Sequence, residues 1–325
     1  RNKLYLKDRV TETLGLLYAD HYPNRQFETA RNIRRSPIHH LLEKEGAVFG
    51  EIAGWERANW FAFKNQERKY IYNWDKQNWF ENHRQEHQSI RENIGLIDMS
   101  SFGKIRIEGE DSCKFLQYLC SNNINVKNGK IIYSQMLNTL GGIESDLTVT
   151  RLDKNLFLLI VPASTLQRDL FWINKHRKNY NVTITDITPS EAVFLVMGPN
   201  SRKFLQSISP NDLSNDNHPF GYAKNIELGY GFARAHRISY VGELGWELYI
   251  SAEQSCHIFE FLKKEGVKYN LKLCGLHSLD SCRIEKAYRH FGHDITDEDH
   301  VLEAGLGFAV DTEKNFIGKK ILLEK

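Results

Sequence analysis

Two stretches of the chain share one pattern, and this repeat constrains the fold more than any other feature of the sequence. The segments KIRIEGEDSCKFLQYL (104–119) and VFLVMGPNSRKFLQSI (193–208) each run from a strand pattern through a glycine and a polar triplet into Lys-Phe-Leu-Gln. The strand–glycine–helix context favours duplication over a chance match between two short helices. The repeat therefore predicts a pseudo-symmetric pair of α+β halves, at about residues 95–190 and 191–310.

The rest of the sequence mixes strand and helix patterns without a regular βαβ alternation. Apolar or alternating runs predict strands at 103–108, 130–138, 143–151, 156–162, 181–187, 191–197, 232–240 and 246–250. Capping residues and helical spacing predict helices at 111–120, 164–178, 200–208, 252–265 and 276–289. This interleaving is typical of the α+β class and not of a doubly wound parallel sheet.

The charge balance and the motif content argue against several classes of function. Lys and Arg number 43 against 41 Asp and Glu, so the net charge of +2 provides no footprint for nucleic acid. No apolar run approaches the roughly 20 residues of a membrane-spanning helix, and no metal-ligand spacing such as HExxH occurs. The five cysteines form no CxxC pair, which favours free thiols in a reducing compartment, either the cytoplasm or, in a eukaryote, the mitochondrial matrix.

A glycine pair at 141–142 precedes a strand whose polar residues fall on one face. Strand alternation groups these residues as Glu144, Asp146, Thr148 and Thr150. A loop of two or four residues around Leu140 and Gly141 pairs Tyr133 of the preceding strand with Thr148. A turn centred on Gly141 and Gly142 shifts the pairing by two residues, which leaves each side chain on the same face. Tyr133, Asp146 and Thr148 therefore share one face, with side chains about 5–8 Å apart.

A second hairpin is expected over 236–250, in HRISYVGELGWELYI. A loop centred on Glu243 and Leu244 places Tyr240 directly opposite Glu247, so a phenol again stands beside a carboxylate. Each pair taken alone fits an ordinary solvated cross-strand contact. Taken together, in repeated halves, they indicate one shared cavity for a flat polar heteroaromatic, with rings to stack on and carboxylates to accept paired N–H donors.

Six segments carry a resemblance to a known family: SPIHHLLEKEGAVFGEIAGWE (36–56), IGLIDMSSFGKIRIEGEDS (94–112), YSQMLNTLGGIESDLTV (133–149), VMGPNSRKFL (196–205), SYVGELGWELYI (239–250) and DSCRIEKAYRHFGHDI (280–295). Together they resemble the aminomethyltransferase family, which includes the glycine cleavage T-protein and the folate-binding half of sarcosine and dimethylglycine dehydrogenases. Two departures from the T-protein pattern favour the dehydrogenase branch. Ser145 stands where T-proteins usually carry an aspartate, and Leu279 stands where they carry an arginine.

The resemblance implies a division of the chain. Residues 1–35 are similar to the segment that joins the FAD half of the dehydrogenases to their folate half, and 36–325 resembles the aminomethyltransferase-like folate-binding domain around a central folate cavity. No GxGxxG fingerprint occurs, so FAD is expected only in a partner subunit or in a missing N-terminal half. The small β-rich domain that usually ends the family's chains is expected to be missing.

The resemblance also implies roles for individual residues. Asp146 would lie near folate N10 and the reacting carbon, as a general base or as an anion that stabilises a cationic iminium. The cofactor-binding residues would be Tyr133, which stacks on or edges the folate, Thr148, which bonds the pterin, Tyr240, which packs on the pterin ring, Glu247, which accepts its N–H pair, and Tyr288. Tyr288, as an expected helix residue, could equally belong to the core.

The expected function is transfer of a formaldehyde-level carbon from an N-methyl amine or its iminium, of the sarcosine or dimethylglycine type, to tetrahydrofolate. The product is 5,10-methylenetetrahydrofolate, and a flavoprotein dehydrogenase subunit is an expected partner. One alternative is a tetrahydrofolate-dependent demethylase that moves a methyl group. Another is a folate-binding or assembly module without catalysis.

Overall fold

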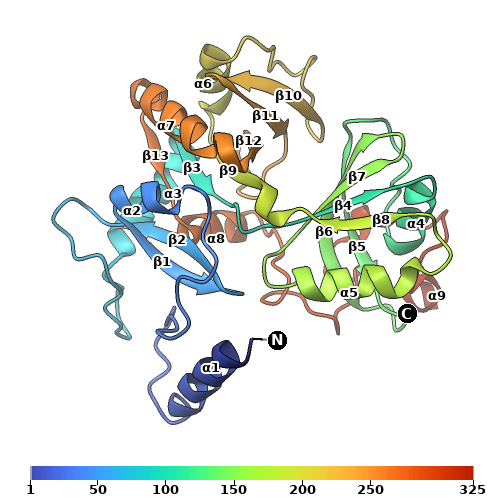
Figure 1. Cartoon of the computed structure of the whole chain (residues 1–325), viewed down its shortest axis with the longest axis horizontal. Helices are drawn as coiled ribbons and strands as arrows, with labels where there is room; N and C mark the ends of the chain where they lie inside the picture. Colours follow the sequence, from blue (N-terminus) through green and yellow to red (C-terminus); the bar gives the residue numbers. More distant parts are fainter. Residues whose placement is uncertain (1, 325) are drawn as a thin grey trace.

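The computed structural model describes residues 2–324, which form two larger β-sheets, a small two-stranded sheet and an N-terminal arm that projects from the body (Figure 1). The helices are α1 (Lys3–Gly15), α2 (His39–Lys44), α3 (Phe80–Glu92), α4 (Ser112–Leu119), α5 (Leu166–Arg177), α6 (Ser201–Ile208), α7 (Ser255–Gly266), α8 (Leu276–Glu285) and α9 (Lys319–Glu324). The strands are β1 (Ala47–Ile52), β2 (Trp55–Phe61), β3 (Ile94–Asp98), β4 (Gly103–Glu108), β5 (Ile131–Leu137), β6 (Ile143–Asp153), β7 (Leu156–Val161), β8 (Thr183–Asp186), β9 (Glu191–Met197), β10 (Ala223–Leu228), β11 (Gly231–His236), β12 (Gly245–Ser251) and β13 (Leu271–Leu273).

The two larger sheets repeat one arrangement. In the chain, the succession strand, helix, three strands, helix, strand runs from β4 to β8 and again from β9 to β13. In space, the order β5-β6-β7-β4-β8 corresponds to β10-β11-β12-β9-β13, with β3 inserted between β9 and β13. The predicted α+β class and the predicted duplication are therefore confirmed.

The glycine of each repeat has the same structural role. Gly109 and Gly198 adopt φ of +135° and +134°, a region that side chains rarely enter. A Cβ at Gly109 would lie 2.3 Å from the Asn181 carbonyl oxygen, and one at Gly198 would lie 2.2 Å from that of Asn93. Only glycine fits at either position, which explains why the sequence repeat contains it.

Several elements differ from the sequence expectations. The sequence analysis did not predict five of the strands: β1, β2, β3, β10 and β13. They are short or charged, and several pair only with distant segments, as β3 does with β9. The helix predicted over 276–289 ends at Glu285, and Ala287 adopts a positive φ of 54°, which an α-helix does not allow. No helix among the described residues is long and apolar enough to cross a membrane.

Separate apolar clusters cover the two faces of each sheet. Helices α4 and α5 pack on one face of the five-stranded sheet, and α6 and α7 pack on one face of the six-stranded sheet (Figure 1). A third cluster joins the remaining faces: it contains Leu158 and Ile160 of β7 together with Val193 and Leu195 of β9. The same cluster contains Ile90 of α3 and Leu279 and Cys282 of α8, so the second face of the six-stranded sheet packs partly on these helices and partly on β7 of the other sheet. Thr148, in the polar row of β6, pairs with Ile160 and therefore lies beside this inter-sheet cluster.

Asp169 of α5 carries a buried charge that its surroundings satisfy only in part. The Thr165 hydroxyl donates to its Oδ2 at 2.7 Å, whereas Oδ1 and the Ser145 Oγ are buried without a partner among the described residues. Burial, only partly offset by hydrogen bonding, raises the pKa of Asp169 to about 7. This carboxyl therefore contributes stability below pH 4, and the contribution is lost as the pH rises through 7.

We predict that Asp169→Asn increases the free energy of unfolding by about 1–3 kcal/mol at pH 8.5 and changes it little at pH 4. The amide is uncharged at both pH values and can donate to Ser145. Urea unfolding at the two pH values measures the difference, with the exposed Asp216→Asn as the control. An equal effect of Asp169→Asn at both pH values would show that ionisation of Asp169 does not change the stability of the fold.

Candidate functional site

The hairpin of β5 and β6 builds the first part of the candidate site. Tyr133 pairs with Thr148 and Gln135 with Asp146, as the sequence predicted for Tyr133 and Thr148. The opposite face, with Leu147 and Val149, is buried in the cluster under α4 and α5. The shared face of Tyr133, Asp146 and Thr148 is therefore confirmed, and it is turned away from those helices.

Asp146 is half-buried, and its carboxylate makes no ion pair with a Lys or Arg among the described residues. The Gln135 Nε2 donates to its Oδ1 at 2.8 Å. Burial raises the pKa of Asp146 to about 6, although hydrogen bonds from Tyr133 and Gln135 lower it. The group is thus mostly ionised at pH 7 and still close enough to its pKa to exchange a proton. Gln135 was missed by the sequence analysis, although its cross-strand position opposite Asp146 could have identified it.

Polar atoms on the same face lack partners. Gln135 Oε1, Thr148 Oγ1 and Thr150 Oγ1 are buried and make no hydrogen bond within the described residues. A buried polar atom without a partner costs about 1–3 kcal/mol, so these three atoms are available to a polar ligand or to water.

The second hairpin has a different register from the one predicted. Glu247 pairs with His236, not with Tyr240, because β11 ends at His236. Beyond that point Arg237 exchanges backbone hydrogen bonds with Gly221 and Tyr222, and Val241 is buried. The chain therefore continues as an irregular loop from 237 to 244, and the predicted direct pairing of Tyr240 with Glu247 is wrong.

Glu247 nevertheless lies beside a phenol, that of Tyr249. The Tyr249 hydroxyl donates to Glu247 Oε2 at 2.7 Å, and the Tyr249 and His236 ring centroids are 4.3 Å apart. Arg234 Nε donates to His236 Nε2 at 3.2 Å, which leaves the His236 proton on Nδ1. Burial raises the pKa of Glu247 to about 7, against the lowering effect of the Tyr249 hydrogen bond. His236 was missed because the predicted register placed Tyr240 opposite Glu247. Tyr249 was missed although strand alternation places it on the same face as Glu247, two residues further along β12.

Tyr240 and Tyr288 meet outside the strands. The Tyr240 hydroxyl donates to the Arg289 carbonyl at 2.7 Å, and the Tyr240 and Tyr288 rings stack with centroids 6.1 Å apart. Tyr288 follows the end of α8 and is exposed, so it is neither a helix residue nor a core residue. Tyr133 stacks in the same way on Phe308, at 6.0 Å, an aromatic that the sequence analysis did not single out.

Thr148 of the first hairpin and Glu247 of the second border the same cluster. Ile160 pairs with Thr148, Leu195 pairs with Glu247, and both Ile160 and Leu195 belong to the inter-sheet cluster, against which Tyr240 also packs. Burial raises the pKa of Tyr240; the positive charge of Arg283 lowers it, and the charge of Asp146 raises it.

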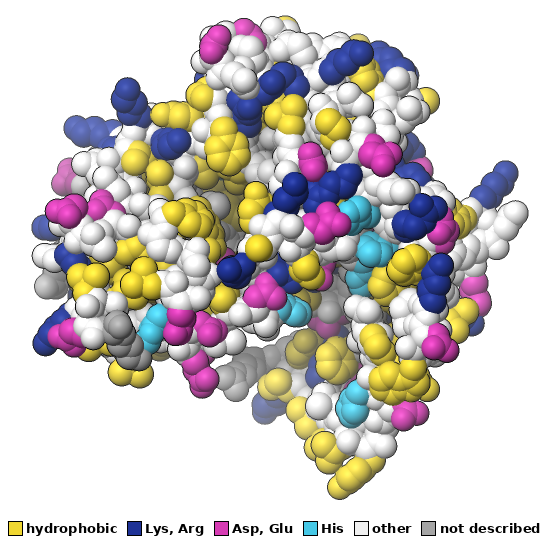
Figure 2. All heavy atoms as spheres, turned by 180° about the vertical axis from the view of Figure 1, so that it is seen from behind, with side chains coloured by type: hydrophobic (Ala, Val, Ile, Leu, Met, Phe, Trp, Pro, Cys, Tyr) yellow, Lys and Arg dark blue, Asp and Glu magenta, His cyan; other side chains and the backbone are white. Residues whose placement is uncertain are grey.

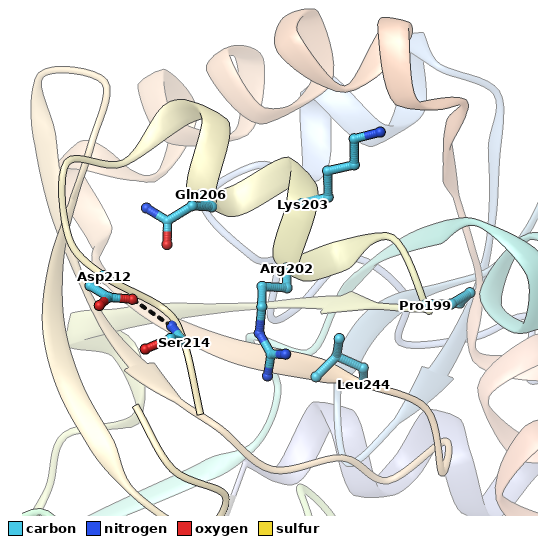
Figure 3. A pocket seen from close by; sticks show the side chains of 7 residues that line it. All are labelled: Pro199, Arg202, Lys203, Gln206, Asp212, Ser214 and Leu244. Carbon is cyan, nitrogen blue, oxygen red and sulfur yellow. Dashed lines mark hydrogen bonds between the residues drawn. The ribbon is translucent and has the colours of Figure 1, made fainter. Parts of the chain in front are cut away.

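A surface pocket of about 440 Å³ lies elsewhere, on α6 (Figure 3). Figure 3 shows Arg202, Lys203 and Gln206 on that helix and Leu244 at the pocket's edge. None of its lining residues is among those predicted for the site. Within residues 2–324, no group of three or more His, Cys, Asp or Glu side chains is arranged to hold a metal ion.

The protein is thus a duplicated α+β protein with an acid–phenol pair on each of its two larger sheets: Asp146 with Tyr133, and Glu247 with Tyr249. Residues 38–314 match the family model of the GCVT N-terminal domain, so the chain belongs to the folate-dependent aminomethyltransferase family. The solved glycine cleavage system aminomethyltransferase T of Bartonella henselae superposes with a TM-score of 0.75 at 26% identity, over 90% of this chain and 74% of that one.

Two curated relatives extend the comparison. The chain is 40% identical to the 4-methylaminobutanoate oxidase (formaldehyde-forming) of Paenarthrobacter nicotinovorans and 34% identical to the mitochondrial dimethylglycine dehydrogenase of Rattus norvegicus. These matches cover 99% and 98% of this chain but only 39% and 38% of the relatives. Residues 1–36 match the FAD dependent oxidoreductase central domain.

We predict that Tyr249→Phe raises the pKa of Glu247 above 7, by about one unit, because the carboxylate loses its hydrogen-bond donor. Carbon-13 NMR titration of the glutamate carboxyl groups measures the shift. Tyr230→Phe, which removes a hydroxyl from an exposed ring, is the control and leaves the titration unchanged. An unshifted Glu247 in Tyr249→Phe would show that the hydroxyl does not stabilise the charged form.

Proposed function

We propose that the chain catalyses tetrahydrofolate-dependent one-carbon transfer. It accepts a formaldehyde-level carbon from an N-methyl amine or iminium of the sarcosine or dimethylglycine type and forms 5,10-methylenetetrahydrofolate. The observation that carries the proposal is the Asp146 site: a half-buried carboxylate with a pKa of about 6, beside Tyr133 and Gln135.

The residues present fit tetrahydrofolate. The pterin ring is flat and carries paired N–H donors and ring acceptors, which match carboxylates, hydroxyls and phenol faces. Thr148 Oγ1 and Gln135 Oε1 are buried without partners, and Glu247 Oε2 accepts only from Tyr249, so polar capacity remains for such a ring. Thr148 and Glu247 would hold the ring edge, and Tyr133 and Tyr240 would pack on the ring or border it.

Asp146 has two roles in the proposed reaction. As an anion in a buried setting it stabilises a cationic iminium donor, since charge interactions are stronger away from water. As a base it takes a proton from a reacting nitrogen, and its pKa of about 6 suits that transfer near neutral pH. Gln135 fixes the carboxylate orientation through its 2.8 Å hydrogen bond.

Bound tetrahydrofolate supplies the nucleophilic nitrogens that take the one-carbon unit, while the donor leaves as an amine. The protein's larger contribution to the rate is to hold donor and acceptor together, because this removes the entropy cost of a bimolecular encounter. The similarity to a formaldehyde-forming oxidase and to a dimethylglycine dehydrogenase supports an N-methyl donor and a flavoprotein partner.

We predict that Asp146→Asn lowers formation of 5,10-methylenetetrahydrofolate at least about 100-fold, because the amide is neither a base nor an anion. The assay supplies iminium from a flavoprotein that oxidises dimethylglycine, and mass spectrometry detects the product. Calorimetry is expected to give tetrahydrofolate affinity within about threefold of wild type, since Asn keeps the shape of the side chain.

Asp153→Asn, a matched change at the exposed end of β6, is the control and retains turnover. Unchanged turnover in Asp146→Asn would refute the assigned role. Detection of 5-methyltetrahydrofolate from the wild type would identify a demethylase instead. Tetrahydrofolate binding without any product would identify the chain as a folate-binding module without catalysis.

The pH dependence tests the same assignment. The rate of product formation is expected to rise with pH and to level off above about 7, because the active form of Asp146 is ionised and its pKa is about 6. Steady-state rates between pH 5 and 8 measure this limb. A rate that stays constant below pH 6 would exclude Asp146 as the titrating base.

A further inference from the structure

Two arginines beside the pocket on α6 lie close together without an acidic partner. Arg202 of α6 and Arg237, which directly follows β11, both donate from Nη2 to Asn215 Oδ1, each at 2.7 Å. The two nitrogen atoms are therefore at most twice that distance apart. Their other acceptors are neutral as well: Leu213 O for Arg202 Nε and His218 O for Arg237 Nη1. Neither guanidinium forms an ion pair with an Asp or Glu of residues 2–324.

This arginine pair carries two positive charges that the protein leaves uncompensated. The guanidinium carbons of Arg202 and Arg237 lie 5.7 and 5.8 Å from the ring centroid of Trp246, and a ring face offsets only part of the repulsion between like charges. Burial lowers the pKa of Arg237, and the charge of Arg202 lowers it further. On the face drawn in Figure 2, Lys and Arg side chains are interspersed with Asp and Glu side chains. Two adjacent guanidinium groups without an acid therefore indicate that a bound anion supplies the missing charge.

The pocket beside the pair has room for such an anion. It is called the α6 pocket below, has a volume of about 440 Å³ and is lined by Pro199, Arg202, Lys203, Gln206, Asp212, Ser214 and Leu244. In Figure 3 the Arg202 side chain extends from α6 with Ser214 on one side and Leu244 on the other. Arg202 Nη1 makes no hydrogen bond within the described residues and is not enclosed, so its N–H groups are available to a ligand.

The acid in the lining does not neutralise the pair. Asp212 accepts the backbone N–H of Ser214 at 2.7 Å and a side-chain N–H of Asn217, and it makes no ion pair with Arg202. Lys203, exposed on the same helix, adds a further positive charge at the edge of the pocket. The charges around the α6 pocket are thus predominantly positive.

We propose that the α6 pocket binds a divalent oxyanion of the phosphate type, either free or as the phosphate group of a small molecule. A guanidinium group presents paired N–H donors that match phosphate oxygens. Arg202 Nη1 contacts the anion, and Arg237 contributes its charge from the other side of Asn215. The pocket is larger than one phosphate, which leaves space for the rest of a small molecule. The site contains no residue of the Asp146 hairpin and does not rest on the proposed function.

Calorimetric titration of the full chain with inorganic phosphate tests the proposal, at low ionic strength because salt screens charges. The wild type is expected to bind phosphate at least about 10-fold more tightly than acetate, since a divalent anion gains more from two adjacent positive charges than a monovalent one. Arg202→Gln is expected to weaken phosphate binding at least about 10-fold, because it removes a charge and its N–H donors.

Two further variants separate the ligand site from a structural role of Arg202. Arg177→Gln, the same change at an exposed arginine of α5, is the control and is expected to keep phosphate affinity within about twofold. Arg202→Lys keeps the charge but loses the fork that holds Leu213 and Asn215, and it is expected to lose less affinity than Arg202→Gln. Equal losses in these two Arg202 variants would show that Arg202 only fastens the loop.

The comparison of phosphate with acetate needs no variant, so it tests the proposal even where Arg202→Gln fails to fold, which circular dichroism detects. Absence of phosphate binding by the wild type would overturn the proposal. Acetate binding as tight as phosphate binding, or an equal loss of affinity in Arg177→Gln, would overturn it as well.

Discussion

The candidate site is built around two carboxylates, Asp146 and Glu247, that the protein encloses without a cationic partner among the described Lys and Arg residues. Asp146 and Glu247 each receive one or two neutral hydrogen bonds and no ion pair from the described Lys and Arg residues, so burial raises the pKa of both. Such groups are costly in a fold that gains nothing from them. Their cost is understandable when a ligand supplies the missing donors, and groups with perturbed pKa values concentrate at functional sites for this reason.

The duplication provides the scaffold for these groups, but the site residues do not follow the repeat. Both halves share the strand order and the glycine before their first helix. The acid–phenol pairs, however, are not related by the repeat: Tyr133 and Asp146 lie on the second and third strands of their half, β5 and β6, whereas Tyr249 and Glu247 both lie on the fourth strand of theirs, β12. The site is thus asymmetric within a symmetric frame, which suits a ligand whose two ends differ.

Local sequence patterns were enough to predict the α+β class, the duplication and the common face of Tyr133, Asp146 and Thr148. These follow from local rules: side chains alternate along a strand, so any permitted turn leaves the same residues on one face. The tertiary structure alone decided that Glu247 pairs with His236, that Tyr240 leaves the sheet and that Tyr288 lies beyond its helix. Where a strand ends depends on which distant backbone satisfies its hydrogen bonds; Arg237 finds Gly221 and Tyr222 rather than β12, and no local pattern encodes that choice.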